Sequence, residues 1–189
     1  MTSAFLSDIH ANADALEKSL RFLRSLNIKT IYCLGDIIGY GSYPNEVVSL
    51  IRKEKVVAIK GNHEKIFLKG VYPEKYNMPY TKNVLTDSSL DYLKALPEII
   101  ELKEYNAVLS HAVPFTDDDY CYADSDFSVF NSLNYNMIFM GHAHRPMLVT
   151  YHAKRIINPG SVGQPRDGID KASVLICDLD DQRFEFVRI

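Results

Sequence analysis

Histidine placement is the most informative feature of this 189-residue sequence. Five of the six histidines follow a short apolar run within a few residues: His10, His63, His111, His142 and His144. Asp8, Asp36 and Asn62 stand in the same polar clusters. A lone histidine is usually an ordinary surface or core residue, and we expect this of His152, which lies elsewhere. The clustered side chains are better explained by one shared site.

The residue types in these clusters suit metal binding. Imidazole with carboxylate and amide oxygens, and without thiolate, favours Mn, Fe, Zn, Co or Ni over a purely oxygen-liganded Ca or Mg site. The candidates outnumber the roughly four to six ligands of one ion, so we expect two divalent transition-metal ions, Mn²⁺ before the others. In Asp8-x-His10 and His142-x-His144, alternate residues of an extended segment would point to one side and reach the same metal cluster.

A pair of metal ions indicates hydrolysis of a phosphate ester. We expect a shared carboxylate, that of Asp36, to hold the ions about 3.5–4 Å apart. Such a pair lowers the pKa of a bridging water, offsets phosphate charge and orients in-line attack. Two divalent ions carry more charge than two aspartates cancel, which suits a hydroxide and an anionic substrate.

The apolar runs before the clusters are predicted strands, at residues 4–6, 31–34, 56–59, 107–109 and 137–140. Helices are predicted from leucines at helical spacing over 16–26, after Pro44, and from Ser88. This alternation predicts a parallel sheet whose carboxyl edge gathers the clusters. Segments 155–157, 172–177 and 184–189 follow without helices and predict hairpins, in a second sheet or as an antiparallel extension of the first.

Composition is that of a single folded domain over residues 1–189. Hydrophobic residues make up 47% and charged residues 24%, so the chain can build a core without disulfides. The net charge of -3 and the lack of a Lys/Arg cluster disfavour nucleic acid. Cys33, Cys121 and Cys177 are odd in number and widely spaced, unlike a disulfide framework or a CxxC site. No apolar stretch suits a membrane span or a signal peptide, so a cytoplasmic location is expected.

The clusters together resemble the calcineurin-like metallophosphoesterases, and in particular their small prokaryotic phosphodiesterases. The motifs occur in order as Asp8-x-His10, Gly35-Asp36-x-x-Gly39, Gly61-Asn62-His63-Glu64, Ser110-His111, Gly141-His142-x-His144 and Asn158 to Arg166. The resemblance implies an α/β/β/α sandwich of two packed, mostly mixed sheets flanked by helices. It implies that Asp8, His10 and His144 bind one ion, that Asn62, His111 and His142 bind the other, and that Asp36 bridges them.

The same resemblance implies a catalytic role for His63 beside that of Asp36. His63 would face the substrate, where it stabilises the transferring phosphoryl group or protonates the leaving group. A metal-bridging hydroxide would attack phosphorus directly, without a covalent intermediate. The protein phosphatase branch has an aspartate that orients this histidine, followed by a phosphate-binding arginine. Here Gly39 and Tyr40 occupy those positions, so protein phosphatase activity is not expected.

Candidate substrate-binding residues are Arg166 and Tyr40. Arg166 could bind phosphate in a bidentate manner or form a salt bridge with a nearby aspartate. Tyr40, Tyr43 and the aromatic segment 70–83 could stack on an ester arm. The alternative for that segment is packing on the body of the protein or on another subunit. The run 117–119 is interpreted as a solvated acidic turn.

These features predict a phosphodiesterase acting on a small phosphate ester or a nucleotide-type substrate, without a membrane partner and with a homo-oligomer left open. The alternatives are a phosphomonoesterase and a dinucleoside polyphosphate hydrolase. A non-catalytic scaffold on this fold, like the retromer subunit that resembles these enzymes, is less favoured. That subunit lacks the catalytic histidine, whereas His63 and every ligand position are intact here.

Overall fold

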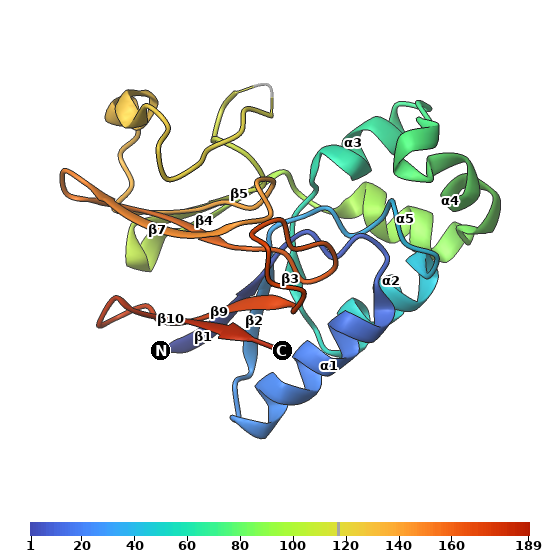
Figure 1. Ribbon diagram of the computed structural model, residues 1–189, viewed down its shortest axis with the longest axis horizontal. Helices are drawn as coiled ribbons and strands as arrows, with labels where there is room; N and C mark the ends of the chain where they lie inside the picture. Colours follow the sequence, from blue (N-terminus) through green and yellow to red (C-terminus); the bar gives the residue numbers. More distant parts are fainter. Residues whose placement is uncertain (117) are drawn as a thin grey trace.

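Two five-stranded mixed sheets form the centre of the protein in a computed structural model that describes residues 1–116 and 118–189 (Figure 1). The first sheet has the order β10-β9-β1-β2-β3, built from β1 Thr2–Leu6, β2 Thr30–Cys33, β3 Val57–Ala58, β9 Ser173–Asp178 and β10 Arg183–Arg188. The second has the order β4-β5-β6-β8-β7, built from β4 Ile99–Leu102, β5 Ala107–Ser110, β6 Met137–Phe139, β7 Pro146–Tyr151 and β8 Lys154–Pro159.

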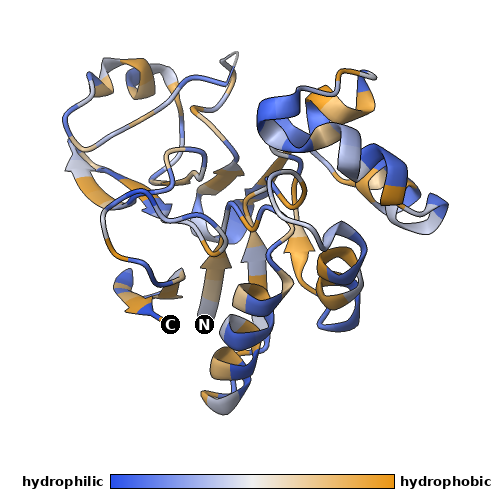
Figure 2. Ribbon diagram, turned by 45° about the vertical axis from the view of Figure 1, so that its right-hand side comes forward, coloured by the Kyte–Doolittle hydropathy of each residue, from blue (hydrophilic) through white to orange (hydrophobic). Residues whose placement is uncertain are grey.

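The first half of the chain alternates strands and helices, as the sequence predicts. Helix α1, Ala13–Ser25, connects the parallel strands β1 and β2, and α2, Pro44–Lys53, connects β2 and β3. Asn12 caps α1 by accepting a hydrogen bond from the Ala15 amide, and Pro44 starts α2 where no amide donor is needed. Both helices bury one apolar face and turn a hydrophilic face outward (Figure 2). These crossovers hold the carboxyl ends of the three parallel strands at one edge.

Further helices follow β3 and stand apart from the two sheets at the right of Figure 1. They are α3 Asn62–Leu68, the 3₁₀ helix η1 Glu74–Tyr76, α4 Met78–Val84 and α5 Asp87–Ala95. The segment 70–83, which the sequence indicates only as an aromatic loop, therefore contains all of η1 and most of α4. Helix α5 begins at Asp87, one residue before the predicted start, because Thr86 and not Ser88 supplies the cap.

The core between the sheets is aromatic and aliphatic. Phe5 of the first sheet stacks on Phe139 of the second at 4.1 Å between ring centroids, and on Tyr32 at 5.1 Å. The outer face of the second sheet is covered by residues 121–135, whose 3₁₀ helix η3, Phe127–Ser132, buries Phe130. The last short element is the 3₁₀ helix η2, Lys103–Tyr105. The predicted α/β fold of two mixed sheets flanked by helices is confirmed, with a thin cover on the second sheet.

The C-terminal strands realise both predicted arrangements. The β7–β8 hairpin joins the second sheet, and the β9–β10 hairpin extends the first sheet antiparallel to β1. Strands β4 and β7 do not appear among the predicted strands. Each is an edge strand with partly exposed residues, so it lacks the apolar run that marks the buried strands. None of the helices described is both long and apolar enough to cross a membrane.

Candidate metal centre

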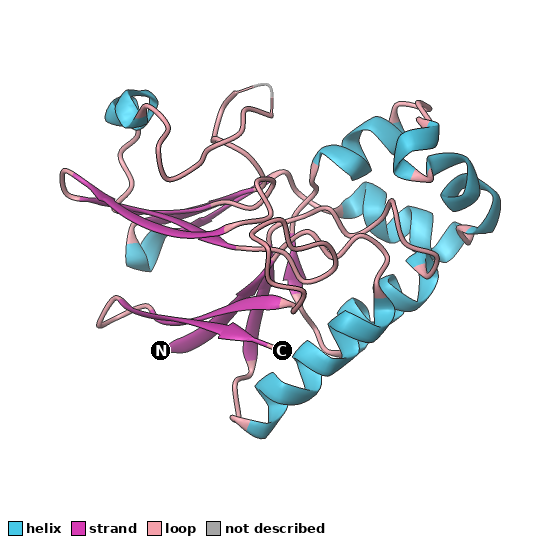
Figure 3. Cartoon of the chain, in the orientation of Figure 1, coloured by secondary structure: helices cyan, strands magenta, loops and turns pink. Residues whose placement is uncertain are grey.

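The predicted site residues converge at one edge shared by both sheets. They lie in the loops after β1, β2, β5 and β6 and at the start of α3, which follows β3, and the loop after β8 joins them. These strands are parallel within each sheet, so their carboxyl ends meet. Figure 3 shows the loops gathered at this edge, between the sheets and the helices. All seven candidate ligands and His63 are brought together here, and His152 is not among them.

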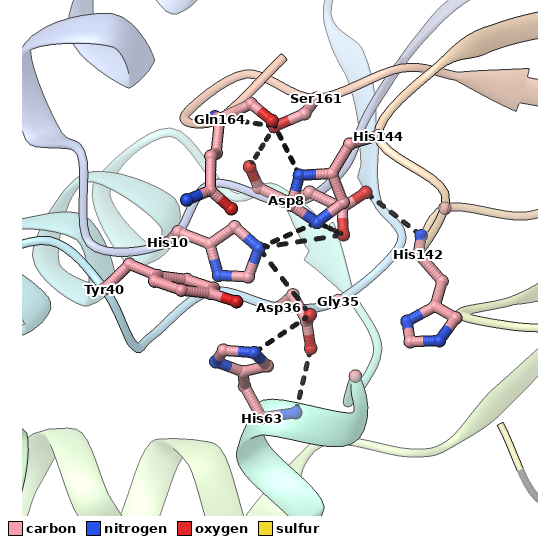
Figure 4. Close-up of polar contacts among 12 residues, drawn as sticks. Asp8, His10, Gly35, Asp36, Tyr40, His63, His142, His144, Ser161 and Gln164 are labelled. Carbon is pink, nitrogen blue, oxygen red and sulfur yellow. Dashed lines mark hydrogen bonds and ion pairs between the residues drawn. The ribbon is translucent and has the colours of Figure 1, made fainter. Parts of the chain in front are cut away.

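The first ligand group consists of Asp8, His10, Asp36 and His144, all buried (Figure 4). One ligand atom from each lies within 4.8 Å of every other. His10 Nε2 is 3.1 Å from His144 Nε2, which in turn is 3.3 Å from Asp8 Oδ1. This spacing leaves room for one small cation among the four side chains.

The second group consists of Asp36, His111 and His142, under the same distance limit. Asn62 completes it, because its Oδ1 is 3.0 Å from His111 Nε2. Asp36 therefore belongs to both groups. Its Oδ1 accepts a hydrogen bond from the His63 amide at 2.9 Å, while its Oδ2 lies 3.7 Å from His10 Nε2 and 3.4 Å from His111 Nε2. Asp36 Oδ2 is thus the atom placed between the groups.

Main-chain carbonyls orient three of the histidines. The Nδ1 atoms of His10, His111 and His144 contact the carbonyl oxygens of Ile38, Leu34 and Gln164 at 3.3, 2.7 and 2.6 Å. A carbonyl can only accept, so each Nδ1 carries the proton and each Nε2 presents a lone pair to the site.

This arrangement fits divalent cations. The His10 and His144 lone pairs face each other at 3.1 Å, as do those of His111 Nε2 and Asn62 Oδ1 at 3.0 Å, and such pairs repel without a positive charge between them. Among the described residues, Asp8 Oδ1 is buried and has no hydrogen-bond partner. The chain therefore has a site of Asp and His donors suited to a divalent metal.

The pKa values of the buried side chains fit a site that binds a positive charge. Burial raises the pKa of Asp8 to about 7. Burial also lowers the pKa of His142 and His144 to about 4, so both are neutral donors near neutral pH. For His111, burial lowers the pKa but the charge of Asp36 raises it more, to about 10. The Asp36 carboxylate thus draws a positive charge toward His111 Nε2, and a bound cation would supply that charge in place of a proton.

The backbone at the ligands differs from the extended segments predicted for Asp8-x-His10 and His142-x-His144. Five ligands have positive φ: Asp8 (52°), His10 (51°), Asp36 (53°), His142 (64°) and His144 (56°). That expectation is wrong because β1 ends at Leu6 and β6 at Phe139, before the ligands. The strained turns are held by main-chain bonds such as Asp8 N to Gly35 O and His10 N to Asp36 O.

Glu64 is a positioning residue. It belongs to the motif Gly61-Asn62-His63-Glu64, but the sequence predicts no role for it. Its buried carboxylate accepts four main-chain hydrogen bonds, from Asp36 and Gly61 on Oε2 and from Ile37 and Ile38 on Oε1, all at 2.8–3.0 Å. It therefore joins the loop that carries Asp36 to the start of α3. The sequence signal is a glutamate three residues after Gly61, the spacing of a capping box.

His63 lies beside the ligands without belonging to either group. Its Nε2 is 3.8 Å from Asp36 Oδ2, and its ring lies 4.6 Å from His10 between centroids. Burial, together with His111 and Arg166, lowers its pKa against the opposing effect of Asp36. Gly39 is pressed against its other nitrogen, since a Cβ built there would lie 2.2 Å from His63 Nδ1.

The two predicted substrate-binding residues meet at the rim of the site. Arg166 is exposed, and its Nη2 lies 3.4 Å from the Tyr40 hydroxyl and 2.7 Å from Gln164 Oε1. Within the described chain Arg166 makes no ion pair, whereas Asp167 pairs with Arg188. Burial is the main cause that lowers the pKa of His63 and His144, and the nearby Arg166 guanidinium lowers both pKa values further.

Two further tyrosines line the rim: Tyr76, which the sequence indicates only as part of the aromatic segment 70–83, and Tyr120, which it does not indicate. Tyr120 stacks on His142 at 3.8 Å between centroids, and Tyr76 lies 4.6 Å from His63. No local motif marks either residue. Tyr43 is half exposed at the start of α2. Of the run 117–119, residue 117 lies outside the described residues; Asp118 pairs with Lys65, and neither Asp118 nor Asp119 joins a ligand group.

Comparison with known proteins finds similarity over nearly the whole chain. Residues 1–182 match the family model of the calcineurin-like phosphoesterase superfamily domain. An uncharacterized protein of Methanocaldococcus jannaschii is 40% identical over 210 aligned positions, covering 98% of this chain and 86% of the relative.

Two solved structures are similar along their length. A metallophosphoesterase from Sphaerobacter thermophilus superposes with a TM-score of 0.85 at 30% identity, covering 100% of this chain and 88% of that one. A hypothetical protein from Pyrococcus horikoshii superposes with a TM-score of 0.88 at 22% identity, covering 100% and 87%. The second likeness concerns the fold alone.

Proposed function

Because the chain belongs to the calcineurin-like phosphoesterase superfamily, we propose that it binds two divalent ions and hydrolyses phosphodiesters. The family match also confirms the resemblance carried by the motifs, and it makes the chain a phosphoesterase with a metal site of Asp and His donors. The proposal for two ions rests on one observation: Asp36 is the one residue that belongs to both ligand groups found among the described residues.

The ligand roles follow from the grouping. Asp8, His10 and His144 would hold one ion; Asn62, His111 and His142 would hold the other; Asp36 would contact both. When bound, such a pair supplies Lewis acidity, charge neutralisation and an activated water for in-line attack on phosphorus. The mixture of imidazole and oxygen donors supports Mn²⁺ as the native metal, with Fe, Zn, Ni or Co as alternatives.

His63 and Arg166 would act on the phosphoryl group itself. His63 Nε2 lies 3.8 Å from Asp36 Oδ2, and from there it can donate to a phosphoryl oxygen or to the leaving group. Arg166 carries a permanent charge over the same space and can pair with a non-bridging oxygen of the phosphate. Asp36 has a positioning role as well, because its Oδ1 binds the His63 amide.

The aromatic rim supports preference for a diester. Tyr40 and Tyr120 come from two different loops, and their rings flank His63 and His142. A phosphodiester has a second ester arm that needs an apolar surface, and tyrosine rings can stack on an aryl group or a nucleobase. A small phosphate ester or a nucleotide-type diester is therefore the proposed substrate. A dinucleoside polyphosphate would use the same rings.

A phosphomonoesterase is the second candidate, and the position of Arg166 favours it. A monoester dianion gains more from a guanidinium than a diester monoanion does. Tyr40, in the loop after β2, carries no positive charge. Arg166, in the loop after β8, supplies a positive charge beside it. The scaffold alternative has no comparable support, since His63 stands beside a complete ligand set.

Metal analysis and matched substrates test the proposal. Protein stripped with a chelator and reloaded with Mn²⁺ should hold two ions per chain by elemental analysis and anomalous scattering. Bis(p-nitrophenyl) phosphate should then be hydrolysed with a higher kcat/KM than p-nitrophenyl phosphate, followed by assays of cyclic nucleotides and dinucleoside polyphosphates. A single ion bound away from Asp36 would overturn the bridging role. A clear preference for the monoester would move the chain to the second candidate.

A further inference from the structure

His63 is held without a polar partner for its inner nitrogen. The side chain is buried, and Nδ1 has no hydrogen-bond partner among the described residues. An aspartate at position 39 would not fit beside Nδ1 in this geometry, because its Cβ alone would lie 2.2 Å from that atom. The hydrogen bonds that orient His10, His111 and His144 therefore have no counterpart at His63.

Aromatic rings surround His63 instead. The Tyr76 ring lies 4.6 Å from the imidazole between centroids at an interplanar angle of 45°, and the Tyr40 ring lies at 5.1 Å and 34°. The two tyrosine rings also contact each other edge to face at 5.4 Å. Figure 4 shows Tyr40 alongside His63 and His10. Contacts of this kind restrict a ring that no hydrogen bond fixes.

Tyr76 is itself anchored to the loop after β2. The Tyr40 amide donates to the Tyr76 carbonyl at 2.6 Å, and Asn77 Nδ2 donates to the Tyr40 carbonyl at 3.2 Å. Asn77 ends η1 in the left-handed conformation, and the next residue, Met78, is fully buried against Gly39. These contacts hold the backbone at Tyr76 beside the loop that carries Tyr40.

We propose that Tyr76, with Tyr40, is a positioning residue that holds the His63 imidazole over Asp36 in place of a hydrogen-bonding partner. The inference rests on the proposed function for its kinetic consequence only. It gives the aromatic segment a role distinct from stacking on substrate: Tyr76 acts through His63. Loss of the ring should let the imidazole turn away from the phosphoryl group while leaving the ligand groups intact.

A double-mutant cycle with His63 tests this role. Tyr76→Leu should lower kcat about 10- to 100-fold with unchanged KM and metal content, since a misplacement of about 1 Å can cost that much. Tyr76→Phe keeps the ring and should restore kcat to near the parent value. In a His63→Gln background, Tyr76→Leu should have no further effect. Tyr92→Leu, which removes a half-buried ring from α5, is the matched control and should leave kcat unchanged.

The outcomes separate the possible failures. An equal loss of kcat in the His63→Gln background, or a raised KM, would show that Tyr76 acts on substrate or on the fold, and would overturn the inference. Parent-like kcat in Tyr76→Leu would do the same. If the parent hydrolyses no phosphate ester, the proposed function fails, and crystal structures decide the inference: a displaced His63 ring in Tyr76→Leu but not in Tyr76→Phe supports it, and an unmoved ring overturns it. If Tyr76→Leu does not fold, Tyr76→Met replaces it under the same criteria.

Discussion

Replacing Gly39 by alanine should disable His63 without removing the metal site. Gly39 has φ of +87°, and a Cβ there would lie 2.2 Å from His63 Nδ1 and 2.9 Å from its Cε1. Ordinary contact begins near 3.4 Å, so the imidazole must move by about 1.2 Å. A shift of this size costs on the order of 100-fold in kcat, which corresponds to about 2.7 kcal/mol of transition-state stabilisation. Separately, alanine in this left-handed backbone conformation should lower the free energy of unfolding by roughly 1–2 kcal/mol.

The control for this variant is Gly168→Ala. Gly168 has nearly the same φ, +83°, but a Cβ there would meet nothing within 4 Å. Both variants should lower Tm by about 2–8 °C, from about 2–4 °C per kcal/mol in a domain of this size. Only Gly39→Ala should also lose turnover of an aryl phosphodiester, with metal content unchanged by elemental analysis. Full activity in Gly39→Ala would refute the close contact between His63 and Gly39. Loss of metal from this variant would refute the assignment of His63 as a residue that does not bind metal.

Three further outcomes are expected. Asp36→Asn should lose metal and activity together, because its Oδ2 faces both ligand groups, whereas His63→Ala should keep its metal and lose about 10²–10⁴-fold in turnover; equal metal loss from both would make His63 a ligand. Arg166→Ala should raise KM more than it lowers kcat, and unchanged kinetics would show that the guanidinium does not bind substrate. Glu64→Gln should lower the free energy of unfolding by about 2–4 kcal/mol in thermal or denaturant melts, because an amide nitrogen cannot accept the main-chain hydrogen bonds of one carboxylate oxygen. The exposed change Glu17→Gln is its control and should stay within about 0.5 kcal/mol; an equal effect of the two would contradict the role of Glu64.

The convergence of the candidate ligands could be predicted from the sequence because each of them follows a strand closely. Parallel strands of one sheet end at one edge, so Asp8 and Asp36 had to lie close together. His111 follows a strand of the second sheet, and it joins them because the two sheets pack with their carboxyl edges together. The strands themselves could be recognised because burial on both faces demands a continuous apolar run. Edge strands such as β4 escape that demand, and their sequences carry no equivalent signal.

Local turn geometry and loop packing could not be predicted in the same way. The ligands lie in left-handed turns because bonds between separate loops hold them there, and a local pattern such as Asp8-x-His10 carries no record of those partners. Glu64 shows the same limit, since its spacing after Gly61 marks a helix start but not its bonds to Ile37 and Ile38.

The family, the order of strands and helices in the first half of the chain, and the donors that could bind metal therefore follow from the sequence alone. These depend on residue type and on short spacings within one segment. The folded arrangement was needed to show that Asp36 turns one oxygen toward both candidate ligand groups, and that Tyr76 and Tyr120 flank the site. The physical reason is that both tyrosines lie on segments without a strand of their own, whose paths are set by packing against loops distant in the sequence.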